Sequence, residues 1–153
     1  MKIVIAVLVG AAILATATSN CFAQKPKIVN LVPGSWYAYK KGLPLTAGCK
    51  NPSFVAKANR ILRNNEPDPQ DNFKQEGCTA DWGLGVDTDP LKFKFKVVRS
   101  YVIDGKTIVE KVMKIYYSAL GKVEDYTLFI DADDINPLPL APVTLEELKK
   151  MGM

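Results

Sequence analysis

The stretch from residue 91 to residue 131 constrains the fold most, because apolar and polar side chains alternate along it as they do along a half-buried β-strand. At its start, lysines alternate with apolar residues: Lys92, Phe93, Lys94, Phe95, Lys96 and Val97. The pattern predicts three consecutive strands, over 91–103, 107–119 and 122–131. Asp104-Gly105 and Gly121 supply the turns, and strands joined by such short turns form an antiparallel meander.

Upstream of this meander, a helix is predicted to begin at Asn51. Asn is a good N-cap, and Pro52 follows at the first helical position, where its missing N–H costs nothing. Apolar residues then recur at helical spacing: Phe54, Ala58, Ile61 and Leu62. The helix is predicted to end near Asn64-Asn65.

The remaining elements are short. Two strands are predicted over 25–31 and 35–40, and Thr144 and Glu147 form a capping box for a final helix over about 145–150. The sequence therefore predicts an α+β fold, in which an antiparallel sheet (the C-terminal three-stranded meander plus the N-terminal strands) packs on one amphipathic helix. With 48% hydrophobic and 24% charged residues, the composition argues against a disordered chain or a multispanning membrane protein.

Residues 1–23 have the organisation of a secretory signal peptide. Lys2 supplies the positive charge, the stretch Ile3–Ala17 is almost wholly apolar, and Cys21-Phe22-Ala23 forms a small-x-small cleavage site. We therefore expect cleavage after Ala23, a single mature domain over 24–153, and export to the bacterial periplasm or the extracellular space. An uncleaved N-terminal anchor and lipoprotein processing at Cys21 are the alternatives. No membrane span is expected after cleavage.

Cleavage would leave two of the three cysteines, Cys49 and Cys78. A pair of cysteines in an exported chain is most simply a structural disulfide. Closing a loop of roughly 30 residues would stabilise the fold by about 3.6 kcal/mol in the chain-entropy model. The alternative is a thiol metal site or a redox pair, but the spacing is not C-x-x-C and the chain has no histidine to complete a zinc site.

The chain offers few residues for catalysis. Without histidine, mechanisms that need imidazole are excluded, and no G-x-S-x-G, H-E-x-x-H or phosphate-binding loop is present. An acidic cluster invites a calcium hypothesis, but it has neither the glycine nor the distal glutamate of an EF-hand loop: Asp131, Asp133, Asp134 and Asn136. We expect no metal, no cofactor and no enzyme, with a carboxylate-based hydrolase as the alternative.

One candidate binding face consists of Lys92, Lys94 and Lys96, which alternation places on one side of a strand, with Lys111 or Lys114 adjacent across the hairpin. Such a face would bind an anionic surface. The alternative is an ordinary solvated face or a guard against strand pairing. Losing Lys2 leaves 19 basic against 16 acidic residues, a charge of +3, so we expect no nucleic-acid partner.

Gly34-Ser35-Trp36-Tyr37 resembles the G-x-W-Y signature that opens the first strand of lipocalins, exported barrels that carry small hydrophobic ligands. The resemblance covers only these four residues. Lipocalins place their helix after the barrel, whereas the main helix predicted here precedes the meander. That order is similar to cystatin-type modules, although their Q-x-V-x-G loop is absent.

Two functions follow from these observations. We expect a small, exported, non-catalytic protein that binds another macromolecule, a protein or an envelope component, as an inhibitor, adaptor or envelope factor. The alternative is a lipocalin-like carrier whose apolar pocket is formed by four aromatic residues: Trp36, Tyr37, Phe93 and Phe95.

Overall fold

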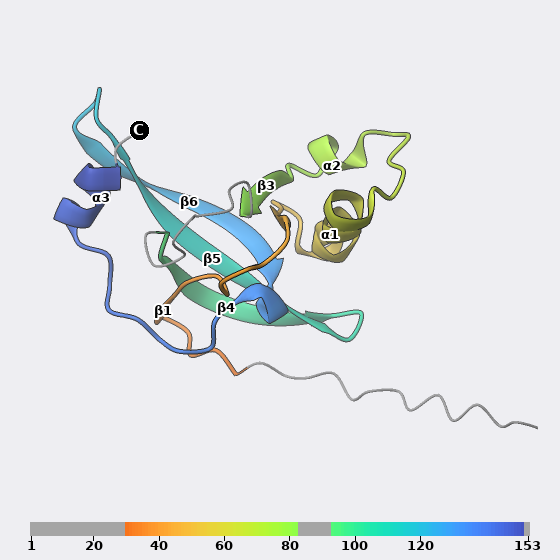
Figure 1. Ribbon diagram of the computed structural model, residues 1–153, viewed down its shortest axis with the longest axis horizontal. Coiled ribbons are helices and arrows are strands. Elements are labelled where there is room, and N and C mark those ends of the chain that lie inside the picture. The colour runs from red at the N-terminus through yellow and green to blue at the C-terminus, as the bar shows by residue number, and fades with distance from the viewer. Residues whose placement is uncertain (1–29, 83–92, 152–153) are drawn as a thin grey trace, which may run out of the picture.

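The computed structural model describes residues 30–82 and 93–151 (Figure 1). In chain order its elements are β1 (Trp36–Tyr37), β2 (Thr46–Gly48), the 3₁₀ turn η1 (Pro52–Phe54), α1 (Val55–Asn64), α2 (Asn72–Gln75), β3 (Thr79–Trp82), β4 (Phe95–Ile103), β5 (Lys106–Tyr117), β6 (Lys122–Asp131), the 3₁₀ turn η3 (Ala132–Asp134) and α3 (Leu145–Met151). The predicted signal peptide, most of the strand predicted over 25–31, and Lys92 lie outside the described residues.

The predicted fold class is confirmed: an antiparallel sheet packs against a helix and carries one disulfide. In the described residues the main sheet has four strands in the order β1-β4-β5-β6, and the predicted meander forms three of them. The turn between β4 and β5 has positive φ at both Asp104 (49°) and Gly105 (74°). Such a turn matches the right-handed twist of the flanking strands, which explains why Asp-Gly marks the hairpin in the sequence.

The two faces of the main sheet carry separate apolar clusters. The first face is covered by the chain around β1 and after β6, and its cluster consists of Leu31, Tyr37, Tyr39, Phe95, Val97, Val109, Ile130, Ala132 and Ile135. The second face packs against α1, and its cluster consists of Ala47, Cys49, Val55, Ala58 and Ile108. The core is therefore split into two layers by the sheet.

The helix predicted from Asn51 is present, and its local signals act as expected. The Asn51 side chain accepts a hydrogen bond from the Ser53 amide at 3.0 Å, η1 follows, and α1 continues from Val55. The helix ends where Asn65 adopts the left-handed conformation (φ 51°). Arg63 in its last turn donates to the Leu45 carbonyl oxygen and pairs with Asp134, both at 2.7 Å, and so ties the helix to η3.

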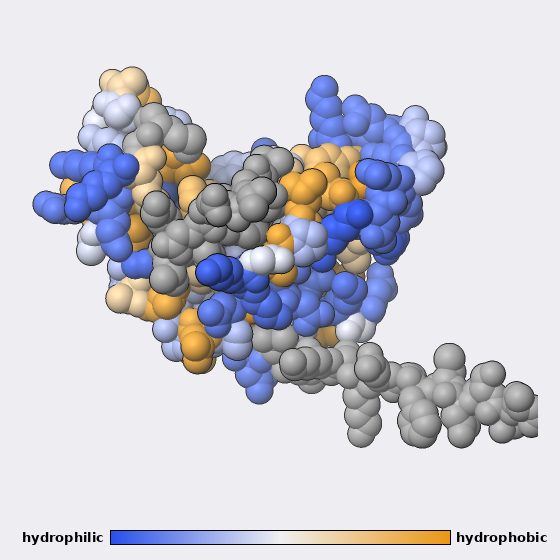
Figure 2. All heavy atoms as spheres, viewed as in Figure 1, coloured by the Kyte–Doolittle hydropathy of each residue, from blue (hydrophilic) through white to orange (hydrophobic). Residues whose placement is uncertain are grey.

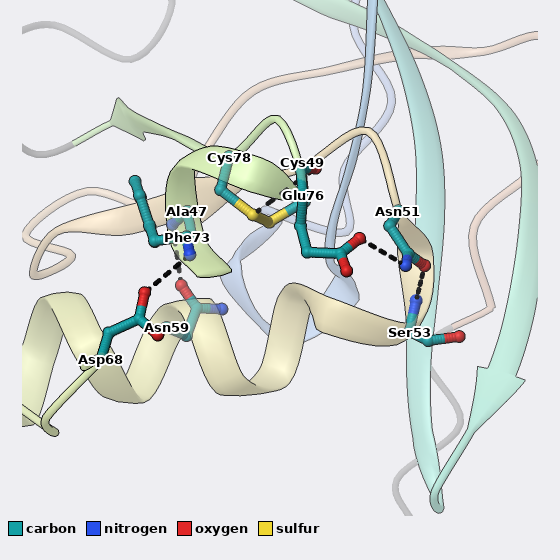
Figure 3. Close-up of a disulfide and its surroundings, with 9 residues drawn as sticks. All are labelled: Ala47, Cys49, Asn51, Ser53, Asn59, Asp68, Phe73, Glu76 and Cys78. Atoms are coloured by element: carbon teal, nitrogen blue, oxygen red, sulfur yellow. Dashed lines mark hydrogen bonds between the residues drawn. A yellow bond between two sulfur atoms is a disulfide. The ribbon is translucent and has the colours of Figure 1, made fainter. Parts of the chain in front are cut away.

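A second small sheet, formed by β2 and β3, has no counterpart in the sequence-based prediction. It joins the edge of β6 because Cys49, directly after β2, exchanges two backbone hydrogen bonds with Phe129 (3.0 and 2.8 Å). The predicted disulfide between Cys49 and Cys78 is confirmed, and Figure 3 shows it beside α1, where Asn59 accepts from the Ala47 amide at 2.8 Å. The disulfide thus fastens β3 and α2 to the strand that α1 covers.

Gly48 marks the closest approach between the two sheets. A Cβ at this position would lie 2.6 Å from Cδ1 of Leu128 and 3.1 Å from Cβ of Asp81. Only glycine allows the backbone of β2 to lie this near to the side chains of β6 and β3.

Candidate binding site on the projecting hairpin

The three lysines predicted as a binding face are in different settings. Lys92 lies outside the described residues. Lys94 pairs with Glu147 of α3 at 2.9 Å, and only 15% of its side chain is exposed. Lys96 is exposed on β4. A common binding role for the three lysines therefore stays a prediction, and Lys96 is the described member that is open to solvent.

The four aromatic residues predicted to line a pocket are also dispersed. Tyr37 and Phe95 lie inside the closed cluster of the first face. Trp36, the neighbour of Tyr37 in β1, points to the second face because side chains alternate along a strand. Phe93 is 39% exposed and lines a small pocket. Within the part of the chain that the structure describes, Phe93 is the member of the four that borders this pocket.

This pocket lies between α3 and β5, has a volume of about 100 Å³, and is lined by Phe93, Lys94, Met113, Lys114, Ile115, Tyr116, Leu148 and Met151. Leu148 is buried against it, which explains how a short helix stays attached to the sheet. The capping box predicted at Thr144 forms: its hydroxyl accepts from the Glu147 amide at 3.2 Å, and the Glu147 carboxylate accepts from the Thr144 amide at 2.7 Å.

The hairpin of β5 and β6 continues beyond the rest of the sheet. The pairing of β4 with β5 reaches Val112, whereas β5 and β6 remain paired as far as Tyr117 and Lys122. We call the continuing part, residues 113–126, the arm. In Figure 1 it rises beside α3, and Figure 2 shows a hollow in the molecular face between this raised part and the part that carries α1 and α2.

Large apolar side chains of the arm are open to solvent: Tyr117 (37% exposed), Leu120 (66%), Val123 (36%) and Tyr126 (36%). Tyr117 and Tyr126 lie on the first face of the sheet and Val123 on the second, as the β5–β6 register requires. Both faces of the arm therefore present apolar surface, although α3 covers part of the first face near Met113 and Ile115.

The outer edge of the arm belongs to β6. Because Phe129 directs its amide and carbonyl groups to Cys49, the outward-pointing backbone groups of β6 recur at every second residue from there. The register between β5 and β6 has no bulge, so these residues are Thr127, Asp125 and Val123. Among the described residues, nothing pairs with their backbone amides and carbonyls.

Sequence reasoning missed a buried ionic cluster on the first face. Lys111 is 1% exposed and its Nζ lies 2.5 Å from Oδ2 of Asp81, which also accepts a hydrogen bond from the Tyr39 hydroxyl. The same ammonium lies 5.1 Å from the ring centre of Tyr39 and 5.0 Å from that of Phe95. A carboxylate and two aromatic faces thus replace the water that a lysine normally keeps.

Burial shifts the pKa values of Lys111 and Tyr39. It lowers the pKa of Lys111, and the charge and hydrogen bond of Asp81 oppose part of that shift. Burial, followed by the charge of Asp81, raises the pKa of Tyr39 well above its ordinary value. Near neutral pH Tyr39 therefore keeps its proton, and its hydroxyl donates a hydrogen bond to Asp81.

Two carboxylates of the acidic cluster at the end of β6, those of Asp131 and Asp134, are engaged in the fold. Asp131 accepts from the Asp133 amide at 3.0 Å and pairs with Lys106 at 2.9 Å. Asp134 pairs with Arg63, and burial raises its pKa while Arg63 acts in the opposite direction. Within residues 30–82 and 93–151, no three His, Cys, Asp or Glu side chains gather as a metal site would require.

No helix in the described ranges combines the length and apolar character needed to cross a bilayer. Comparison with known proteins gives no match, whether with family models, with curated proteins or with solved structures. The function must therefore be argued from the geometry of the molecule.

Proposed function

We propose that this is an exported, non-catalytic protein that binds another macromolecule, a protein or an envelope component, through its arm. The observation that carries the proposal is the exposure of Tyr117, Leu120 and Val123 on a hairpin that extends past β4. Aromatic side chains such as tyrosine are enriched at protein interfaces and contribute much of the binding energy there, and apolar neighbours help to exclude water from them. The disulfide supports export, since such bonds persist in oxidising compartments.

The construction of the arm also favours a binding role. A two-stranded hairpin is marginally stable in water, because it has one layer of side chains on each face and little core. Here the rest of the fold holds the base of the arm, and α3 covers part of one face. A partner that covered the exposed side chains would bury apolar surface without having to fold the hairpin first.

The test compares two variants by capture from the exported fraction of the source cells, with covalent cross-linking before washing. The first replaces the arm side chains: Tyr117→Ser, Leu120→Ser and Val123→Thr. The matched control replaces apolar residues elsewhere that are at least as exposed: Val32→Ser, Val102→Thr and Leu138→Ser. We expect the wild type and the control variant to retain the same partner and the arm variant to lose it, with unchanged melting temperatures. Equal retention by all three proteins would contradict the proposal.

The role of the exposed lysine is tested in the same format. If Lys96 contributes to binding, Lys96→Glu lowers capture, and the loss becomes smaller as the salt concentration rises, because salt screens exposed charges. Equal capture by the wild type and Lys96→Glu would show that Lys96 belongs to the solvated surface and does not contribute to binding.

A carrier function has one observation in its favour, the pocket between α3 and β5. Its volume of about 100 Å³ suits the end of an alkyl chain, since a cavity of about 150 Å³ holds benzene. Titration with a fluorescent fatty acid tests this function. A carrier would show saturable binding that Met151→Trp, at the pocket, abolishes and that Leu145→Trp, on the exposed side of α3, leaves intact. Binding that does not saturate would exclude it.

A further inference from the structure

The open edge of β6 presents a regular set of backbone groups. Val123, Asp125 and Thr127 each direct an amide and a carbonyl away from β5, and nothing in residues 30–82 and 93–151 pairs with them. The side chains of this stretch are exposed, so solvent reaches the groups directly. Unpaired edge groups at this spacing match the hydrogen-bonding pattern of one further extended strand.

We propose that the partner contributes an extended polypeptide segment that adds to the edge of β6 as a new strand. This proposal rests on the function proposed above and specifies the partner: a flexible tail or loop of a protein rather than a folded surface. Main-chain hydrogen bonds would supply affinity independently of sequence, and neighbouring arm side chains such as Val123 and Tyr126 would select among segments.

The fold limits where the segment ends. At one end of the open stretch, the backbone amide and carbonyl of Phe129 already form hydrogen bonds with Cys49. At the other, Gly121 turns the chain back toward β5 with φ 61°. The incoming strand therefore pairs with residues 122–127, and Cys49 prevents it from extending further along β6.

Charge decides against a second copy of this chain as the partner. An antiparallel self-pairing that used all three outward residues would centre on Asp125 and place it opposite its own counterpart. Shifting the centre toward Lys122 by one residue would align the two Glu124 side chains, and shifting it the other way would place Val123 opposite Phe129, whose backbone already bonds to Cys49. Like charges directly opposite each other destabilise a strand pair. The edge therefore favours a different chain, with a basic or neutral residue opposite Asp125.

The probe for this proposal is a phage-displayed library of random dodecapeptides, selected on the full mature protein. Selected peptides are then titrated against Asp125→Pro and Asp125→Ala. Both variants lose the Lys114–Asp125 ion pair (2.8 Å), but only the proline removes the outward amide. Because this amide does not pair with β5, proline is tolerated at the edge and the melting temperature should match that of Asp125→Ala. We expect Asp125→Pro to weaken peptide binding about tenfold relative to Asp125→Ala.

Amide hydrogen exchange provides the second measurement, on the wild type. In the free protein, amides of Glu124, Tyr126 and Leu128 should exchange slowly because they bond to β5, whereas those of Val123, Asp125 and Thr127 should exchange fast. Peptide binding should slow the three outward amides and leave the inward amides unchanged.

Failure of this proposal is distinguishable from failure of the proposed function. If no peptide is enriched, if both Asp125 variants bind alike, or if the outward amides stay unprotected, strand addition is overturned. Capture that still depends on Tyr117, Leu120 and Val123 would then leave macromolecular binding by the arm in place. If the arm variant also retains the partner, both proposals fail.

Discussion

Lys111 and Asp81 place opposite charges inside the first-face core, and each depends on the other to remain there. The ammonium is surrounded by the Asp81 carboxylate and the rings of Tyr39 and Phe95. Removing one member of a buried ion pair leaves an uncompensated charge, which costs more than the pair itself contributes. This cluster is therefore where single substitutions act most strongly on stability.

Replacing the buried ammonium gives the first prediction. Lys111→Met should lower the free energy of unfolding by about 3–5 kcal/mol, because it removes the ammonium that the buried Asp81 carboxylate pairs with. Lys96→Met, on the exposed face of the neighbouring strand, should change stability by less than about 0.5 kcal/mol. Urea unfolding measures both values. A small, equal effect of the two substitutions would show that the Lys111–Asp81 pair does not form.

The sequence does not reveal this cluster. Lys111 occurs in an alternating strand pattern in which lysines ordinarily face water, and we expected either Lys111 or Lys114 to lie beside the lysines of β4. Its burial depends on Asp81, which comes from β3. That contact between distant segments has no local signal in the residues around either partner.

Among the elements, α3 is attached to the sheet through only a few side chains. Leu148 fills the space over β5, and Glu147 links the helix to Thr144 and to Lys94. The hydrogen bond from the Thr144 amide, followed by that from Lys94, lowers the pKa of Glu147 from 4.5 to about 2. The carboxylate thus stabilises α3 only when it is ionised.

The pH dependence of α3 gives the second prediction. Because the pKa of Glu147 is lower in the folded state, its stabilising effect is complete above pH 4.5 and is lost as the pH falls toward about 2. Amide protection in α3 should decline across this range relative to protection at Val109 in β5. Glu147→Gln should show low protection at every pH. If amide protection in α3 fell with pH by the same amount in Glu147→Gln, a group other than Glu147 would be responsible for the pH dependence.

Local signals explain which elements were predictable. Asn51, Pro52 and the apolar stripe act within one helix, and Asp104-Gly105 acts within one turn, so the sequence predicts α1 and the β4–β5 hairpin. β2 and β3 are short, lie far apart in the chain and show no alternation. Their pairing depends on the disulfide and on the bridge from Cys49 to Phe129, which local patterns do not encode. The same bridge shows which backbone groups of β6 point away from β5, so the sequence did not predict the open edge either.

For the molecule as a whole, the disulfide joins parts that the main sheet alone would not hold. The chain from Cys49 to Cys78 contains α1 and α2, and it supplies three of the five buried residues of the cluster on the second face. The hydrophobic cluster of the first face contains no residue of this segment, and the contribution of β3 to that face is Asp81, which pairs with Lys111. The two layers should therefore differ in their dependence on the bond.

Removal of the disulfide gives the third prediction. Reduction, or the double substitution of Cys49 and Cys78 by Ala, should lower the free energy of unfolding by up to about 3.6 kcal/mol, since the unfolded chain regains the freedom of a loop of about 30 residues. Denaturant unfolding at neutral pH measures the loss. Reduced wild type and the double variant should agree with each other. An unchanged midpoint after complete reduction would show that the layer containing α1 does not need the bond.

Gly48 has a consequence for how such a protein can diverge over evolutionary time. A methyl group at this position would lie 2.6 Å from Cδ1 of Leu128, so a mutation to any other residue would require the buried Leu128 side chain to shift or to become smaller. Distant homologues should therefore keep glycine directly before the first bonded cysteine while their surface residues change freely. This Gly-Cys dipeptide, followed by a second cysteine and a three-stranded meander, is the signature by which such homologues can be recognised.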